Sequence, residues 1–155
     1  MIRIVEASSD IEFELAGQLF QEYARQLGFD LSFQDFGNEL REMKQQYSRP
    51  NGMVAIAYND ENQPIGCFGI RHFEHSICEL KRMYIKKTFR GLGFGKQLIS
   101  RAVQFGTELG YKKMRLDTIP SMEAAIHLYE NLGFYEIDAY RFNPIVGTRY
   151  YELQL

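Results

Sequence analysis

The stretch that decides the fold is "RMYIKKTFRGLGFGKQLI", residues 82–99. It begins with alternation typical of a β-strand, continues with basic residues and three glycines at alternate positions, and ends in an amphipathic helical pattern. The unpaired backbone N–H groups at the start of a helix attract anions. Glycines permit positive φ angles and let the backbone approach a ligand closely. The stretch therefore indicates a strand, a turn able to bind phosphate, and a helix.

An ordinary tight turn with solvated basic residues is the alternative, because short glycine motifs often match by chance. Two other phosphate-binding motifs fail on spacing. Gln97 follows Lys96 where a Walker A loop has Ser or Thr, and the even spacing of the three glycines differs from G-x-G-x-x-G. The glycines alone therefore leave the turn and the anion site both open.

Helical patterns precede this stretch. Ser9 and Glu12 form a capping-box pattern, which predicts a first helix that stops at Gly28. Ser32 and Asp35 repeat the capping pattern loosely and predict a second amphipathic helix that runs to the break at "SRPNG". Both helices come before the first long strand-like region.

Strand-like patterns dominate the middle of the chain. Residues 53–85 contain two or three such runs with turn signals at "NDENQP" and "EHS", which predicts an antiparallel meander. After the glycines, a helix ending at Gly110 and the strand "YKKMRLDT" predict a strand-helix-strand crossover between parallel strands. A last helix from Ser121 to Gly133 and strands at "FYEIDAY" and "TRYYELQL" follow.

The composition indicates an ordinary globular protein. The 155 residues predict one domain, residues 1–155, and the formal net charge of −2 gives no reason to expect a nucleic-acid partner. The apolar runs are far below the roughly 20 residues that span a bilayer. The beginning of the chain lacks the apolar stretch of a signal peptide. We therefore expect a cytoplasmic location and no membrane partner.

A metal site is not expected. Cys67 and Cys78 are too few for a disulfide framework, and His72 and His75 lie between them. On a hairpin that turns near His75, Cys67 would lie several residues from the other three, so the four side chains would not converge on one ion. We interpret both cysteines as small buried hydrophobes.

Two motifs together resemble the GCN5-related N-acetyltransferase (GNAT) superfamily. Arg90, Gly93 and Gly95 match the signature R/Q-x-x-G-x-G/A, and residues 128–134 match L-Y-E-x-L-G-F, so the resemblance spans residues 79–134, about a third of the chain. It implies an α/β (mixed α+β) fold. In that fold, about four helices flank a twisted, mostly antiparallel sheet of about six to seven strands, and the strand-helix-strand crossover binds acetyl-CoA.

The resemblance implies which residues bind this co-substrate, with no metal. The loop would bind the pyrophosphate of acetyl-CoA, through Arg90, Gly91, Leu92, Gly93, Phe94, Gly95 and Lys96. The preceding strand would offer its backbone to the pantetheine arm at Met83, Tyr84 and Ile85. Many family members carry an asparagine where this chain has Met122. We expect Ser121 to cap the helix and supply a substitute hydroxyl.

The resemblance assigns general-acid catalysis to Tyr129, and the alternative is an ordinary core aromatic. Glu79 is the predicted base, on one strand face with Lys81 and Met83. Its alternative is a salt bridge to Arg71 or Lys81. Asp117 is a weaker candidate base, or else binds the ammonium group of the substrate.

Aromatic residues lie where the family sets its acceptor. They suggest a partly aromatic pocket rim, with ordinary core packing as the alternative. The residues are Phe29, Phe33, Tyr140, Phe142 and Tyr150. We expect transfer of an acetyl group to a primary amine of a small molecule or peptide. The alternative is a non-catalytic acetyl-CoA binding or sensing module, and the family also leaves a homodimer open.

Overall fold

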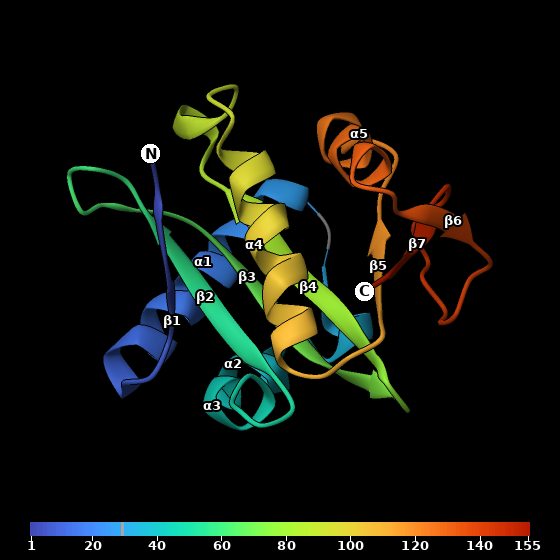
Figure 1. Cartoon of the computed structure of the whole chain (residues 1–155), viewed down its shortest axis with the longest axis horizontal. Helices are drawn as coiled ribbons and strands as arrows, with labels where there is room; N and C mark the ends of the chain where they lie inside the picture. Colours follow the sequence, from blue (N-terminus) through green and yellow to red (C-terminus); the bar gives the residue numbers. More distant parts are fainter. Residues whose placement is uncertain (29) are drawn as a thin grey trace.

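The computed structural model describes residues 1–28 and 30–155, and it places the strands of this part of the chain in one α/β sheet (Figure 1). The strand order is β1-β2-β3-β4-β5-β7-β6. The bounds are β1 (Arg3–Glu6), β2 (Met53–Tyr58), β3 (Pro64–Glu74), β4 (Ile77–Ile85), β5 (Lys113–Thr118), β6 (Tyr135–Ile137) and β7 (Arg149–Gln154). Only β4 and β5 pair in parallel within the described sheet.

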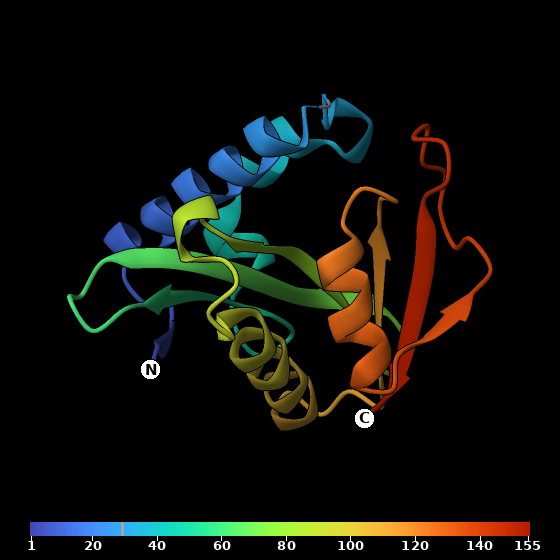
Figure 2. The ribbon, with the colours of Figure 1, turned by 90° about the horizontal axis from the view of Figure 1, so that it is seen from above.

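Helices cover both faces of the sheet (Figure 2). Their bounds are α1 (Asp10–Leu27), α2 (Phe36–Arg41), α3 (Met43–Gln46), α4 (Phe94–Glu108) and α5 (Glu123–Asn131). One buried cluster packs helices α1, α2 and α3 against one face of the sheet. A second cluster packs α4 and α5 against the opposite face. None of the described helices has the length and apolar character needed to cross a membrane.

The first helix confirms the capping-box prediction. The Ser9 side chain accepts the backbone N–H of Glu12, and the Glu12 carboxylate accepts the backbone N–H of Ser9. Gly28 ends the helix in the left-handed conformation, with φ of 73°. The two ends of α1 are therefore fixed by local sequence.

The prediction of a continuous second helix is wrong. Asp35 has φ of 56° and makes no side-chain cap, and the helix breaks at Glu42, where φ is −114°. The break lets buried Glu39 reach Arg82 of the sheet while Met43 packs into the core beside α1. A tertiary ion pair thus overrides the local helical pattern.

The crossover prediction is confirmed: β4, α4 and β5 form the parallel unit, and the apolar face of α4 is buried against the sheet. Pairing between the parallel strands is confined to Ile77–Glu79 of β4 and Lys113–Arg115 of β5. Beyond these residues the two strands diverge, as Figure 1 shows. This splay opens the sheet toward the C-terminal ends of both strands.

A β-bulge lies within β4 at Arg82, where φ is 55°. While β3 runs from Cys67 to Gly69, β4 runs from Tyr84 back to Lys81, so β4 carries one extra residue. The bulge shifts the alternation of all β4 side chains that follow it.

The bulge overturns the prediction that Met83 shares a face with Glu79 and Lys81. Lys81 reaches Gln34 on the α1–α3 side of the sheet, and Glu79 pairs with it. Met83 instead packs against the cluster under α4 and α5. A one-residue insertion reverses the face of every later side chain, because strand alternation has a period of two.

Candidate active site

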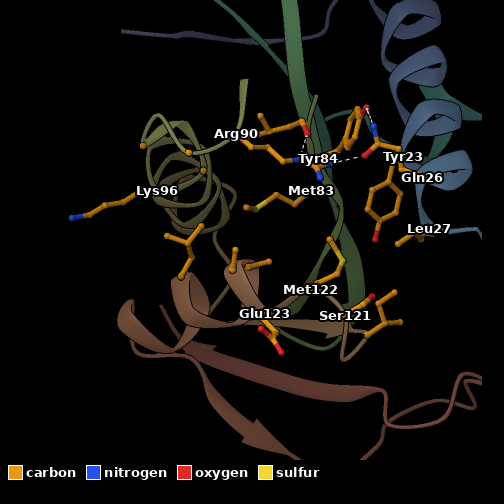
Figure 3. A pocket seen from close by; sticks show the side chains of 18 residues that line it. Tyr23, Gln26, Leu27, Met83, Tyr84, Arg90, Lys96, Ser121, Met122 and Glu123 are labelled. Carbon is orange, nitrogen blue, oxygen red and sulfur yellow. Dashed lines mark hydrogen bonds between the residues drawn. The ribbon is translucent and has the colours of Figure 1, made fainter. Parts of the chain in front are cut away.

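A cavity of about 540 Å³ lies between α1, the glycine loop and the start of α5 (Figure 3). The predicted residues that line it are Met83, Tyr84, Ile85, Arg90, Gly91, Gly93, Gly95, Lys96 and Ser121. Sequence reasoning missed the contribution of α1, made by Tyr23, Gln26 and Leu27. The volume of the cavity is within the range of ordinary small-molecule binding sites.

The backbone of the glycine loop borders this cavity without side chains in the way. Gly91 and Gly93 have φ of 80° and 83°, and a Cβ at either position would meet nothing within 4 Å. No side chain caps the start of α4 at Gly93. The first N–H groups of a 15-residue helix therefore remain available to an anion.

The other loop residues have different surroundings. A Cβ on Gly95 would lie 2.9 Å from Cδ1 of Leu128, so this glycine also allows α4 and α5 to pack closely. Leu92 is 61% exposed, and Phe94 packs against the core. Neither of these two side chains lines the cavity, so any contact of Leu92 or Phe94 with a bound anion would be made by their backbone groups.

Arg90 ties the loop to both α1 and β4. Its Nε donates to the carbonyl oxygen of Ile85 at 2.8 Å, and its Nη2 donates to Oε1 of Gln26 at 2.6 Å. Gln26 in turn donates to the hydroxyl of Tyr84 (Figure 3). Lys96 borders the same cavity, but its side chain extends away from it (Figure 3).

The start of α5 differs from the prediction. The helix begins at Glu123, with Met122 in the N-cap position and no side-chain cap, so Ser121 does not cap it. Ser121 lies one residue too early in the chain for that role, and it lines the cavity instead. Met122 projects into the same space (Figure 3).

A second, small cavity of about 30 Å³ lies between the diverging strands β4 and β5. It shares Tyr23, Met83 and Met122 with the large cavity, so the two adjoin at the splay. Tyr129 of α5 lines it, with the hydroxyl 4.0 Å from Sδ of Met83. Burial raises the pKa of Tyr129, which keeps the phenol protonated.

Two polar groups of β5 face this small cavity without partners. Oδ2 of Asp117 and Oγ1 of Thr118 are buried, and neither has a hydrogen-bond partner among the described residues. A buried carboxylate oxygen without a partner is costly, and such atoms are rare in folded proteins. Asp117 therefore has an unused acceptor at the splay.

Lys81 of β4 lines the same small cavity. Its side chain is 2% exposed, and its Nζ donates to Oε1 of Gln34 at 3.3 Å. Burial lowers the pKa of Lys81 to about 8, although the charge of Glu79 opposes this shift. A buried cation and a buried carboxylate oxygen thus border one small space.

Glu79 lies outside the residues that line either cavity. Its Oε2 is 2.5 Å from Nη2 of Arg141 and accepts the hydroxyl of Tyr140 at 2.9 Å, while its Oε1 lies 3.8 Å from Lys81 and 3.9 Å from Arg71. Burial would raise the pKa of Glu79, but Lys81 and Arg141 outweigh it and leave the pKa lowered. These surroundings fit the salt-bridge interpretation, and the role of base stays a prediction.

The remaining aromatic candidates are spread out. Tyr140 packs edge-on against Phe73 and Tyr150, and Phe142 is 80% exposed. Phe29 and the side chain of Phe33 lie outside the described part of the chain. Of the described candidates, Tyr140, Phe142 and Tyr150 line neither of the two cavities.

The cysteines are free and buried, and burial raises the pKa of both thiols, that of Cys78 to about 12. Among residues 1–28 and 30–155, no group of three or more His, Cys, Asp and Glu side chains is arranged to hold a metal ion.

The sequence model of a family described as "Acetyltransferase (GNAT) family" matches residues 16–134. The chain belongs to this family. An uncharacterised N-acetyltransferase of Schizosaccharomyces pombe is 34% identical to this GNAT protein over 138 residues, which cover 88% of this chain and 85% of that protein. The chain is thus an N-acetyltransferase, and acetyl-CoA is the acetyl donor that its family implies.

Two further proteins resemble this chain, one over part of its length and the other over nearly all of it. N-acetylaspartate synthetase of Homo sapiens is 30% identical over 102 residues, which are 65% of this chain but 34% of that protein. A crystal structure of a GNAT-family acetyltransferase from Staphylococcus aureus matches with a TM-score of 0.79 and 22% identity, over 99% of both chains. The second similarity concerns the fold, which agrees with the predicted mixed, mostly antiparallel sheet.

Proposed function

We propose that this GNAT enzyme transfers the acetyl group of acetyl-CoA to a primary amine of a small molecule or peptide, by direct attack in a ternary complex. The observation that carries the proposal is the meeting of two cavities at the splay of β4 and β5. The larger cavity has the loop expected for a phosphate-bearing ligand, and the smaller one has charged groups suited to an amine.

The residues of the large cavity fit acetyl-CoA. The open backbone at Gly91 and Gly93 leaves room for phosphate oxygens, and Arg90 adds positive charge. Residues 83–85 of β4 lie beyond its pairing with β5, so β5 does not occupy this edge of the strand, and the pantetheine arm can bind there as an added strand would, apart from the Ile85 carbonyl that Arg90 holds. When bound, acetyl-CoA supplies the acetyl thioester.

Tyr129 is the proposed proton donor. Its hydroxyl lies at the small cavity beside Met83, and its raised pKa keeps the proton on the oxygen at neutral pH. Sδ of Met83, at 4.0 Å, is the one hydrogen-bond partner of this hydroxyl among the described residues, so the hydroxyl can donate to the leaving sulfur instead. We expect Tyr129→Phe to lower kcat by about 100-fold with unchanged affinity for acetyl-CoA.

Asp117 is the proposed site for the acceptor amine. Its unpartnered Oδ2 can accept an N–H of the incoming ammonium group and take up or relay its proton through water. Glu79 was the stronger candidate on sequence, but four neighbours already engage it and its pKa is lowered. We therefore propose that Glu79 orders the cations beside the site.

The alternative function, a non-catalytic acetyl-CoA sensor, needs the glycine loop but neither Tyr129 nor Asp117. A buried, otherwise unused phenol and carboxylate at the junction of both cavities favour the enzyme. One relative is named for an acetylated amino acid. Free amino acids therefore belong in the acceptor panel beside simple amines and peptides.

Isothermal titration with acetyl-CoA tests the cofactor site. We expect wild type to bind, and Gly93→Asp and Arg90→Glu to lose most of the affinity, because each places negative charge where phosphate would lie. Gly110→Asp is the matched control: Gly110 also has positive φ and open space, but it follows the far end of α4.

Binding that is unaffected by the two loop variants would contradict the assignment of the glycine loop. Absence of binding at millimolar acetyl-CoA would contradict both the enzyme and the sensor. If acetyl-CoA binds but no amine is acetylated across a broad panel, the sensor becomes the better account.

A further inference from the structure

We infer that the acceptor carries a carboxylate next to its amine, and that Lys81 binds the carboxylate while Asp117 holds the amine. The inference rests on the proposed function and names the class of acceptor for the same site. It predicts a small free amino acid, in place of a simple amine or the N-terminus of a long peptide.

Lys81 has unused hydrogen-bonding capacity. A lysine ammonium group carries three N–H donors. Among the described residues, Gln34 is the one hydrogen-bond acceptor of Lys81, and Glu79 at 3.8 Å is too distant for a hydrogen bond. Because the side chain is 2% exposed, bulk water does not reach the remaining donors freely. An anion at the small cavity would satisfy them.

A group of opposite charge lies on the facing strand. Asp117 of β5 has a buried oxygen with no described partner, and it lines the same small cavity as Lys81 of β4. The two side chains do not form an ion pair with each other in the structure. A simple amine would satisfy Asp117 and leave the remaining N–H donors of Lys81 without acceptors, whereas a zwitterion would satisfy both.

The cations around Glu79 outnumber their ion-pair partners. Arg71, Lys81 and Arg141 share a single carboxylate, that of Glu79, within ion-pair distance. Arg82, which also lines the small cavity, is already neutralised by a bidentate pair with Glu39. Lys81 is buried, whereas the side chains of Arg71 and Arg141 are 26% and 22% exposed, and buried cations are normally paired. The positive excess beside the site therefore favours an acceptor that brings a negative charge.

The volume of the small cavity limits what can bind there. A cavity of about 30 Å³ holds about two water-sized groups, since each needs roughly 10–15 Å³ by this measure. That space takes two polar atoms of a ligand, such as the amine nitrogen and one carboxylate oxygen, and the rest of the acceptor would lie outside it. An amine and a carboxylate separated by a long chain would not fit together between the two strands.

The test compares matched acceptors by measuring release of free coenzyme A. The panel contains free amino acids, their carboxamides and the corresponding decarboxylated amines. We expect the preferred amino acid to exceed its carboxamide by about 100-fold in kcat/KM. Equal or better turnover of carboxamides and simple amines would overturn the inference and leave the proposed function intact.

The variant Lys81→Met removes the charge and keeps the length of the side chain. We expect it to raise KM for the amino acid by about 100-fold, with little change in kcat and no change for the carboxamide. Lys113→Met on β5, outside both cavities, is the matched control and should keep the preference. If Lys81→Met slowed all amines equally, Lys81 would act on the amine itself and the carboxylate assignment would be wrong.

A second measurement separates this inference from the proposed function. Thermal unfolding is followed with millimolar amino acids or their carboxamides in the presence of coenzyme A. We expect the amino acids, but not the carboxamides, to raise the Tm of wild type and not that of Lys81→Met. If no acceptor is acetylated, this shift alone supports the carboxylate site, and its absence overturns it.

Discussion

Two carboxylates on neighbouring strands, Glu79 of β4 and Asp117 of β5, have opposite surroundings. Glu79 is 1% exposed and is engaged by Arg141, Lys81, Arg71 and Tyr140. Asp117 has a buried oxygen with no partner among the described residues, and it borders the small cavity.

This difference separates two kinds of role. A carboxylate surrounded by cations has a lowered pKa and is a poor acceptor for a further proton, but it fixes the positions of its neighbours. A carboxylate with an unused oxygen carries a free-energy cost that a ligand can remove. We therefore expect changes at Glu79 to affect mainly stability and changes at Asp117 to affect mainly activity.

The largest expected effect is that of Asp117→Asn. We expect kcat/KM for the best acceptor to fall by about 1,000-fold, because the amide neither accepts a proton nor balances the ammonium charge. The free energy of unfolding should stay within about 0.5 kcal/mol of wild type, since Oδ2 has no partner to lose. Steady-state kinetics and urea unfolding check both parts. A stable variant with wild-type kinetics would remove Asp117 from the site.

Glu79→Gln should do the opposite and reduce stability more than activity. We expect the free energy of unfolding to fall by about 3 kcal/mol, because three cations lose their shared counter-charge. At a temperature where the variant is folded, kcat/KM should fall by less than about tenfold, since Glu79 lines neither cavity. Chemical denaturation measures the change in the free energy of unfolding. Loss of activity without loss of stability would restore Glu79 as the candidate base.

Lys81 predicts a pH dependence of stability. Its pKa of about 8 in the folded protein lies below the ordinary value of 10.5, so the unfolded chain binds more protons between these two pH values. The free energy of unfolding should therefore rise by about 2 kcal/mol from pH 8 to pH 10 in wild type relative to Lys81→Met. Glu79 and Asp117 raise this pKa, and Arg71 and Arg82 lower it.

Denaturation at several pH values, with wild type and Lys81→Met measured in parallel, tests this prediction. Subtracting the two curves removes the titration of tyrosines and other groups that both proteins share. A difference that stays constant across the window would mean that Lys81 is not desolvated as described.

The smallest expected effect is that of Tyr140→Phe. It removes the hydroxyl that donates to Oε2 of Glu79 at 2.9 Å, while Arg141 continues to bind the same oxygen. We expect a loss of about 1 kcal/mol in the free energy of unfolding. A much larger loss, or a strong effect on KM alone, would place Tyr140 at the acceptor, as its position in the sequence first suggested.

The sequence predicted the features that depend on local pattern. The capping box at Ser9, the crossover around α4 and the glycines at 91 and 93 all follow from short-range spacing. Tyr129, which matches a family signature, lines the small cavity, and its role as general acid stays a prediction. These features need no knowledge of distant contacts.

The rest depended on contacts between distant parts of the chain. The bulge at Arg82 leaves no mark in the alternation around it, yet it moves Met83 to the other face of the sheet. Tyr23 of α1 lines both cavities through helix packing, although its spacing resembles that of an ordinary core residue. The contrast between the two carboxylates likewise arises from partners far along the chain, such as Arg141.

The most direct measurement is the ratio of kcat/KM for Glu79→Gln over Asp117→Asn, determined in one assay with the same acceptor on samples shown to be folded. We expect a ratio of about 100 or more, because Asp117 receives the amine and Glu79 holds cations in place. A ratio below one, with Glu79→Gln inactive and Asp117→Asn active, would contradict it.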